Sequence, residues 1–519
     1  MRIAQHRETK RWRRPSFFTM KQFSALSVLG SFVVTAILVS GLPAGASEWS
    51  GEFALPKVAT NSTCQGGVPN NMTVLTNGRV YLVFKETTNS IGRFKFTWSD
   101  DHGTNWAAPL PFNPQPAAPP SGLPSLAADA TDRLHFCWSS GTSIHYAGLD
   151  PATHVFSEYT LITNAGKNIA FNQITADRSN RLHVIWHTGN AESSSDTAEV
   201  WYAQRPAGAT NFNAPVMLSQ DDGFHSAFPS ADCSGASGEL LAVAWRDTTA
   251  NPYTAGSDWN IKCRVSTNAG ASWNAELTLA SGAHRQFDPL LVVDRNDVIH
   301  VAFHAYPAPP AAPNSNYISL AFSTDAGLTW QNAYGTNGFA RLSPTDENHS
   351  LCKAAYDYAH DIVWYFWKKR VGSAEDLVGV GVFRRGQHVS AIENLTDLAG
   401  GAAAFHNFAV GPDGRLRAHY NRSTVTPANP FDQATIFYRE RNLPAALTPT
   451  ITHLALTSAA ATITWPSEFA VNYTVQTSTN LTDWSAAPGL HTGTGDPLTA
   501  TATNDTAAAQ FFLRLRAER

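Results

Sequence analysis

The segment Pro124-Ser-Leu-Ala-Ala-Asp129, followed after a short polar turn by Arg133-Leu-His-Phe-Cys-Trp138, decides the fold because the chain repeats it. Each copy has an apolar run, a polar turn and a second run that alternates apolar with polar residues. This pattern predicts a β-hairpin. The two closest copies are Asn172-Gln-Ile-Thr-Ala-Asp177 with Arg181-Leu-His-Val-Ile-Trp186, and Pro289-Leu-Leu-Val-Val-Asp294 with Val298-Ile-His-Val-Ala-Phe303.

Four looser copies bring the number of repeats to seven: Gly78–Phe84, Glu239–Trp245, Asp361–Trp367 and Gly414–Tyr420. Successive copies begin about 48 to 64 residues apart, which is the length of a four-stranded propeller blade. The sequence therefore predicts an all-β fold, a β-propeller of seven blades. Six blades are the alternative, because the first and last copies could together complete one blade.

The composition agrees with a large β-rich core and argues against one class of partner. Apolar residues make up 43% of the 519 residues and charged residues 15%, so the chain is not expected to be disordered. The formal net charge is -4, which gives no electrostatic basis for binding nucleic acid.

Three repeats contain a further motif of the form S-x-[DN]-x-G-x-[ST]-W, at Ser99–Trp106, Ser266–Trp273 and Ser323–Trp330. Asn105 replaces the Ser/Thr position in the first of them. The motif suits a tight turn, in which the Asp or Asn side chain caps the turn and Gly adopts a positive φ. It resembles the Asp-box, or BNR, repeat of the sialidase superfamily of β-propellers, and the resemblance covers about residues 50 to 440.

The resemblance implies where a functional site would lie. In that family the box turns join the third and fourth strands, on the face opposite the active site. The loops that enter each first strand and leave each second strand would then converge on the other end of the central channel. We expect catalytic residues among His225, His284, His349, His406, Asp247 and Tyr420, and substrate-binding residues among Arg246, Arg285, Arg422, His187, His304 and Arg370. The four first-strand histidines are expected at nearly the same height along the channel.

By contrast, His135, His183 and His300 recur at one position of the second strand, so we interpret them as part of the blade architecture. The same interpretation applies to Trp138 and Trp186, which the pattern assigns to the core.

Three functions could use the upper face. The first is glycoside hydrolysis of an acidic sugar, for which the sialidase resemblance implies an arginine cluster, a Tyr nucleophile with a Glu, and an Asp acid/base. The Phe-Arg-Ile-Pro element of that family is absent, and Gly66–Asn71 stands in its place. The second is a polysaccharide lyase or related uronate-directed enzyme that uses His, Tyr and Arg. The third is glycan binding without catalysis, as in a lectin.

The two ends of the chain are predicted to be separate from the propeller. Residues 1–46 read as a signal peptide, with a basic start, the apolar stretch Phe23–Leu42 and the small-residue site Ala44-Gly45-Ala46; a retained membrane anchor is the alternative. The propeller is expected over 47–443. Residues 450–519 are predicted to form a small β-sandwich that resembles a fibronectin-III-like tail module.

These features predict an exported protein, either secreted or held in the periplasm or at the cell surface, and a monomer once the signal is removed. Its expected partner is a glycan or polysaccharide. No cofactor is expected. A divalent metal bound by the loop histidines is conceivable, but no ligand spacing supports it.

Overall fold

The computed structural model describes residues 49–518 apart from short gaps and a few single positions: 58–62, 66–69, 115–118, 192–195, 234, 236, 249–258, 282–283, 308–315, 333–336, 345–347, 359–360, 372–373, 384–386, 389–391, 397–401, 424–434, 442–450, 458–459, 468–471, 480–481, 488, 490, 493–496 and 504–511. The predicted signal peptide, the linker before residue 451 and most of Gly66–Asn71 lie outside the described residues. The chain divides into a larger unit within Ser47–Leu443 and a second unit that includes Pro444–Arg519.

All secondary structure in the described residues is β-strand. In the larger unit the strands pair into antiparallel groups in chain order. The first three groups are β3 (Met72–Val74), β4 (Val80–Thr88), β5 (Ile91–Ser99) and β6 (Leu110–Pro111), with β2 (Thr63–Gln65) also on β4; β7 (Ser125–Ala128), β8 (Leu134–Ser140), β9 (Ser143–Asp150) and β10 (Val155–Asn164); and β11 (Ile169–Ala176), β12 (Leu182–Thr188), β13 (Glu199–Arg205) and β14 (Val216–Met217).

The remaining groups belong to two larger sheets. The fourth and fifth are β15 (Ser226–Asp232), β16 (Leu241–Thr248), β17 (Trp259–Ser266) and β18 (Leu277–Ala280), then β19 (His284–Val293), β20 (Ile299–Pro307), β21 (Tyr317–Ser323) and β22 (Ala340–Arg341). The sixth and seventh are β23 (Asn348–Asp357), β24 (Ile362–Val371), β25 (Ala374–Phe383), β26 (Gln387–His388) and β27 (Glu393–Asn394), then β28 (Ala402–Val410), β29 (Leu416–Ser423), β30 (Thr435–Glu440) and β1 (Phe53–Ala54).

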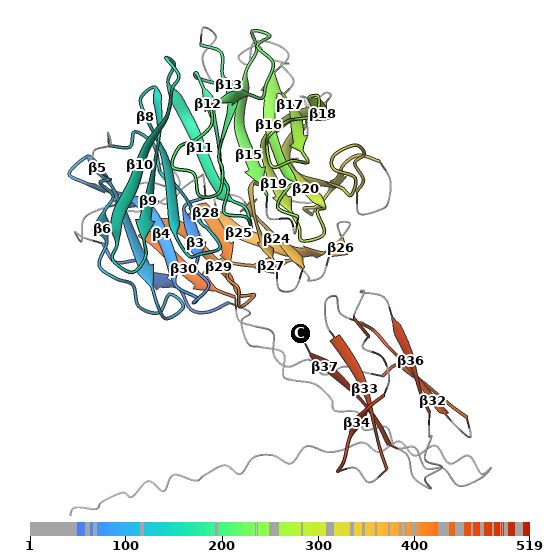
Figure 1. Ribbon diagram of the computed structural model, residues 1–519. Coiled ribbons are helices and arrows are strands. Elements are labelled where there is room, and N and C mark those ends of the chain that lie inside the picture. The colour runs from blue at the N-terminus through green and yellow to red at the C-terminus, as the bar shows by residue number, and fades with distance from the viewer. Residues whose placement is uncertain are drawn as a thin grey trace, which may run out of the picture. The chain divides into compact units, whose positions relative to one another are not determined.

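Each larger sheet is held together by one parallel contact between successive groups. Trp259 of β17 pairs with Arg285 of β19, and Glu375 of β25 pairs with Ala402 of β28. When the sheets are divided at these contacts, the described strands form seven groups, and we infer that each group is one blade. Figure 1 shows the groups following one another from blue to orange, with the last beside the first.

The ring closes through contacts between the two ends of the unit. β1 pairs with β30, with Phe53 opposite Tyr438. The Asn71 side chain links the first group to the seventh, because its Oδ1 accepts a hydrogen bond from Asn407 Nδ2 (3.0 Å) and lies 2.8 Å from His419 Nε2. Closure of this kind removes the free sheet edges that a stack of blades would otherwise expose.

A separate apolar core lies between each pair of neighbouring groups. Tyr81, Phe96 and Trp138 belong to the core between the first and second groups. The core between the seventh and first groups includes Leu82 and Ile436. Trp138 and Trp186 are buried, as expected. Because both faces of every sheet are covered, the second strands of the blades are almost wholly buried, as in the BBBBBBB pattern of β12.

The three predicted turns share one hydrogen-bonding pattern. In the first, Asp101 Oδ1 accepts a hydrogen bond from Asn105 N (2.8 Å), and Ser99 Oγ accepts one from Gly103 N (2.8 Å). Asn268 and Asp325 accept the equivalent bonds in the other two. Each turn follows the third strand of its group, so the opposite end of the ring is where first strands begin and second strands end.

Gly270 in the second of these turns should not tolerate a side chain. Its φ is +87°, and an added Cβ would lie 1.9 Å from the Tyr202 hydroxyl oxygen of the neighbouring blade. We expect Gly270→Ala to lower the free energy of unfolding by about 2–5 kcal/mol. The alanine would be strained by the left-handed backbone, and its Cβ would collide with the Tyr202 hydroxyl. Gly208→Ala is the control, since φ there is +73° and no atom lies within 4 Å. Equal urea midpoints for the two variants would contradict this explanation.

The recurring second-strand histidines bind their own blades, as the sequence indicates. His135 contacts the Tyr146 hydroxyl (2.8 Å) and Asp129 Oδ2 (3.0 Å). His183 makes the same pair of contacts with Tyr202 (2.8 Å) and Asp177 (3.2 Å). These buried Asp–His–Tyr chains fix the hairpin turns to the third strands.

The C-terminal unit contains two small sheets around one core. β31 (His453–Leu456), β32 (Ala460–Trp465) and β36 (Leu498–Thr503) form the first, and β33 (Asn472–Ser478), β34 (Ser485–Ala486), β35 (His491–Thr492) and β37 (Phe512–Glu518) form the second. Trp465, Tyr473 and Leu513 are buried in a shared cluster. The predicted fold class, an all-β propeller followed by a small β-sandwich, is confirmed; the fibronectin-III resemblance of the sandwich remains a prediction.

Candidate functional site

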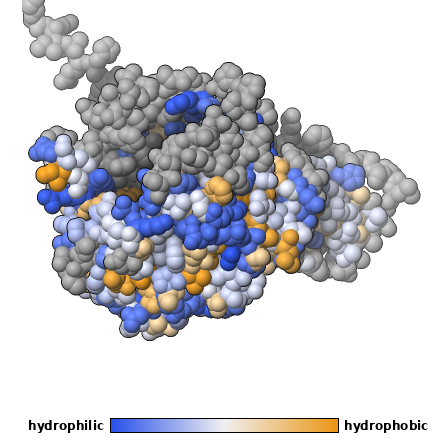
Figure 2. All heavy atoms as spheres, turned by 90° about the horizontal axis from the view of Figure 1, so that it is seen from above, coloured by the Kyte–Doolittle hydropathy of each residue, from blue (hydrophilic) through white to orange (hydrophobic). Residues whose placement is uncertain are grey.

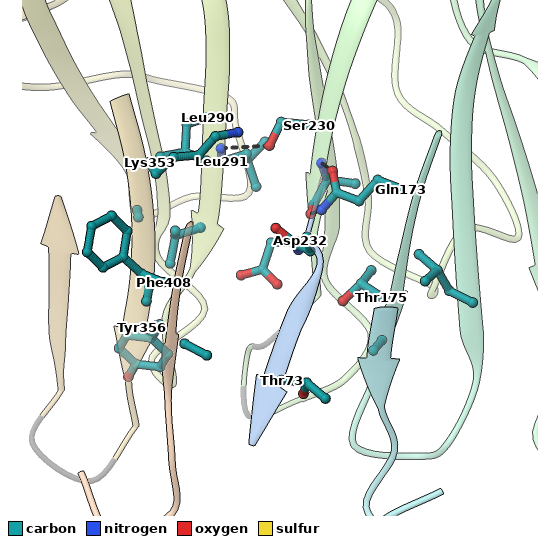
Figure 3. Close-up of a pocket in the computed structure, with 18 of the residues that line it drawn as sticks. Thr73, Gln173, Thr175, Ser230, Asp232, Leu290, Leu291, Lys353, Tyr356 and Phe408 are labelled. Carbon is teal, nitrogen blue, oxygen red and sulfur yellow. Dashed lines mark hydrogen bonds between the residues drawn. The ribbon is translucent and has the colours of Figure 1, made fainter. Parts of the chain in front are cut away.

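The first strands of the seven groups enclose a cavity of about 950 Å³, which we call the bore. Residues from β3, β7, β11, β15, β19, β23 and β28 line it, so every blade contributes to its wall. Figure 3 shows Thr175 and Ser230 directed into it from different strands. On the face seen in Figure 2, described residues are mostly hydrophilic, with apolar ones in small separate patches.

β-Bulges shape the end of the bore opposite the box turns, which we call the mouth. The register shifts between Ala227 and Ser230 in β15 and between Phe287 and Leu290 in β19. At these bulges Phe228 (φ 53°) and Asp288 (φ 48°) adopt left-handed backbone. Non-glycine residues in this region cost of order 1–3 kcal/mol, and such strain clusters at functional sites. Both residues line the bore.

Arg246 lies beside the mouth, at the end of β16. Its guanidinium carbon is 4.0 Å from the ring centroid of Phe228, 4.3 Å from that of Trp259 and 5.4 Å from that of Phe287. The residue is only 7% exposed. Aromatic faces attract a cation and hold its planar group in one orientation.

His304 and Tyr306 continue this aromatic row on β20. The His304 ring stacks on Phe287 (centroids 5.3 Å apart) and meets Tyr306 edge-on (4.7 Å). Its Nδ1 is 3.8 Å from Asp288 Oδ2. Burial lowers the pKa of His304 to about 4, so the imidazole is neutral at pH 7. Burial raises the pKa of Tyr306, which keeps its phenol protonated, although the residue is 36% exposed.

These residues form one continuous group that we call the mouth cluster: His187, Phe228, Arg246, Phe287, Asp288, His304 and Tyr306. His187 joins it through Phe228, whose ring centroid is 5.1 Å away. The group places a cation, a neutral imidazole, a phenol and a carboxylate side by side. That set can neutralise an acidic ligand and move a proton.

The prediction that four histidines share one height is wrong, because the bulges shift the register. Arg246, His304, Lys368 and Asn421 are equivalent, since each is the last second-strand residue paired before a bulge. The first-strand partners of these four residues serve as the common reference height. His349 precedes its reference residue by one position, His225 by two and His284 by three. His406 instead lies inside the bulge of its strand.

Successive strand residues face opposite sides, so offsets of one and two place His349 and His225 on opposite faces of their strands. His406 lines the bore. His225 is buried, and its Nδ1 accepts a hydrogen bond from Ala198 N (3.1 Å). His349 is buried and accepts one from Trp367 Nε1 (2.9 Å). The side chains of His284 and Arg285 lie outside what the structure describes.

Three other expected site residues serve the blades. Tyr420 is wholly buried in the core between the sixth and seventh groups and donates a hydrogen bond to Glu52 Oε1 (2.6 Å). Arg422 binds the other oxygen of Glu52. A Tyr–Glu–Arg set is thus present, but it fastens the chain beside β1. Tyr420 was expected at the channel, but its strand face points between blades, so it lies in the core there.

Asp247 is likewise buried within its own blade. It accepts a hydrogen bond from Ser226 Oγ (2.6 Å) and is paired with Lys262 Nζ (2.9 Å). Burial raises its pKa. The other residues expected to bind substrate lie in two places. Arg370 is exposed near the end of β24. His187, His304 and Arg246 belong to the mouth cluster.

The sequence pattern missed Tyr306, Asp288 and Lys353. Tyr306 follows His304 at the strand period of two, which could have placed both on one face. Lys353 is a lone charge in the apolar run of β23, and it lines the bore. Within the described residues, no three His, Cys, Asp or Glu side chains come together as a metal site. Cys137, Cys233, Cys263 and Cys352 are free and buried.

Buried neutral histidines should make the protein sensitive to mild acid. Burial lowers the pKa of His187 and His304 to about 4 and of His406 and His419 to about 3. Between pH 6.5 and 4 the unfolded chain therefore binds protons that the native chain does not, and stability falls as pH falls. Each histidine adds up to about 1.4 kcal/mol per pH unit.

Glu199 has the opposite effect on stability and offsets about one histidine. Burial raises its pKa to about 7, so in this pH range the native chain binds a proton at Glu199 that the unfolded chain does not. The net expectation is a clear drop in the urea midpoint between pH 6.5 and 4.5. The variant His187→Gln should show a shallower slope. A midpoint that stays constant over this range would contradict the neutral state of these histidines.

No helix in the described residues is long and apolar enough to cross a membrane. No protein-family model matches the chain, and no curated protein matches it.

Solved structures do resemble it. A polysaccharide lyase of family PL25, an ulvan lyase, has a TM-score of 0.52 at 10% identity and covers 75% of this chain and 95% of its own. The lyase bound to -[GlcA(1-4)Rha3S]- gives 0.50 at 10% identity, covering 73% and 94%. The NanB sialidase of Streptococcus pneumoniae gives 0.38 at 12% identity, covering 76% and 71%. At such identities the first two show the fold alone, and that fold is the all-β propeller.

Proposed function

We propose that this protein is a carbohydrate-active enzyme that cleaves a uronate-containing polysaccharide by β-elimination. The observation that carries the proposal is the row Arg246, His304 and Tyr306 beside the bore. It combines a prearranged cation, a neutral imidazole and a protonated phenol within one blade and its neighbour. Such a lyase needs a cation on the carboxylate, a base and an acid.

In the proposed reaction, Arg246 binds the uronate carboxylate and stabilises the negative charge that develops when the adjacent C5–H bond breaks. His304 accepts that proton, and Asp288, 3.8 Å from its Nδ1, stabilises the resulting imidazolium. The electron pair forms the C4–C5 double bond as the C4–O4 bond breaks. Tyr306 donates its proton to the departing O4, so the products are an unsaturated uronate and a free hydroxyl.

Two further points support this choice over glycoside hydrolysis of a sialidase type. The Tyr420, Glu52 and Arg422 set lies between blades, not at the bore. The similar lyase structure was solved with an oligosaccharide that contains glucuronate. A glycan partner, export and a monomeric state belong to the same proposal.

Product analysis on a panel of uronate polysaccharides and sialosides tests the proposal. We expect ultraviolet absorbance from an unsaturated uronate, with matching products by mass spectrometry. Release of free sialic acid would replace this proposal with hydrolysis. Binding without any product would replace it with the lectin-like function.

A further inference from the structure

Lys353 places a cation inside the bore, and among the described residues no group is in direct contact with its charge. It lies on β23, directly after that strand's bulge, and lines the cavity. Figure 3 shows its side chain reaching across the pocket toward Ser230, whose Oγ already accepts a hydrogen bond from Leu291 N (3.1 Å). Among the described residues, no side chain or backbone group forms a hydrogen bond or ion pair with its ammonium. Burial lowers the pKa of Lys353 to about 8, so at pH 7 it is still mostly protonated.

Most carboxylates of the bore are already bound by groups of their own blades. Asp129 is held by His135, and Asp177 by His183 and Arg181. Asp232 Oδ2 accepts a hydrogen bond from Val293 N (2.7 Å). These carboxylates therefore make their hydrogen bonds within the fold, and none of the three is paired with Lys353.

Three charged groups of the wall remain: Lys353, Arg178 and Asp288. The Arg178 guanidinium carbon lies 3.6 Å from the ring centroid of Tyr358, so the third and sixth groups meet at the box-turn end of the bore. Asp288 belongs to the mouth, next to His304. The charge of Asp288 also acts on Lys353 and raises its pKa, but among the described residues the Lys353 ammonium has no hydrogen-bonded or ion-paired partner, so it is available to a ligand carboxylate. A desolvated cation of this kind favours an anionic ligand.

The wall around Lys353 suits a small sugar. Phe228, Leu290 and Phe408 supply apolar surface, while Gln173 and Thr175 supply polar groups. The volume of about 950 Å³ lies in the range of small-molecule sites and exceeds what one monosaccharide needs. Apolar faces with a few convergent polar groups are what the C–H faces and hydroxyls of a pyranose require.

We propose that the bore is itself a binding site for a small carboxylate-bearing sugar, with Lys353 as the group that binds the carboxylate. This site shares Phe228 and Asp288 with the mouth cluster, but its carboxylate-binding group, Lys353, lies outside that cluster, and the proposal does not depend on elimination at the mouth. It would accept a single uronate residue or a chain end that enters past the mouth.

Calorimetric titration of the full chain with D-glucuronate tests the proposal, with D-glucose as the neutral comparison. We expect glucuronate to bind at least ten-fold more tightly than glucose. Lys353→Met should remove that preference, and Lys353→Arg should retain most of it. Lys167→Met is the matched control, because Lys167 is exposed on another blade, and it should bind as the wild type does.

A second measurement uses the wild-type chain alone, so it does not depend on the folding of a variant. Glucuronate, but not glucose, should protect Lys353 from reductive methylation, as followed by mass spectrometry. Equal binding of the two sugars, or full reactivity of Lys353 with glucuronate bound, would overturn the bore site. If Arg246→Met and not Lys353→Met abolishes the preference, the bore proposal fails while the mouth proposal stands.

Discussion

Replacing Arg246 by methionine is expected to lower kcat/KM on a uronate polysaccharide by about 10²–10³-fold, the usual cost of removing one preorganised charge-stabilising group. Methionine keeps an unbranched apolar stem beside Phe228 and Trp259 but removes the guanidinium that lies over their rings. Most of the loss should fall on kcat, because the negative charge on the substrate grows in the transition state. Steady-state kinetics from the rate of ultraviolet absorbance increase measure both constants.

Arg205→Met provides a matched control for this experiment. Arg205 is also buried, with its guanidinium 4.7 Å from the Tyr146 ring centroid, but it belongs to the outer part of the third group. Its loss should reduce stability with little effect on kcat/KM. If both variants lose activity to the same extent, Arg246 acts through the fold and not on the substrate.

Replacing Tyr306 by phenylalanine is expected to lower kcat by about 10²–10⁴-fold, the range for losing a general acid, while KM changes little. The ring contacts with Phe287 and His304 do not require the hydroxyl, so the local packing should persist. Because burial raises the pKa of Tyr306, the wild-type rate should show no alkaline loss from this group below about pH 10.

Tyr317→Phe is the companion control, since Tyr317 begins β21 opposite Ala305 in the same blade. It should retain nearly full kcat. A substrate with a better leaving group than a sugar hydroxyl should restore much of the Tyr306→Phe rate, because it needs less help from an acid. Failure of such rescue would show that Tyr306 does not protonate the leaving oxygen.

The repeat predicted the architecture because its pattern is local. An apolar run, a turn such as Asp177–Arg181 and an alternating run specify a hairpin without reference to distant residues. The box turns were found for the same reason, since their hydrogen bonds connect residues only four positions apart.

The site was harder to predict from the sequence, because it depends on the pairing register of the strands and on the strand face from which each side chain projects. One extra residue at Phe228 or Asp288 displaces everything before it in the first strand, and no local signal marks the bulge. Tyr420 has the residue type of a nucleophile, yet its strand presents it to the interior between blades. Arg246 and His304 were identified because they lie near the ends of second strands, where the hairpin pattern fixes their height.

The pairing of β1 with β30 has a consequence for how the protein comes to be folded. The bond between the side chains of Asn71 and Asn407 spans 336 positions of the chain, and the outermost strand of the last blade is supplied by the beginning of the polypeptide. Until the last hairpin has been synthesised, Phe53 and Ala54 have no partner strand. The last step of ring closure is thus a contact between distant parts of the chain, which is expected to be slow. A chain cut short before Thr435 would lack β30 and would remain an open ring with unpaired strand edges that favour aggregation.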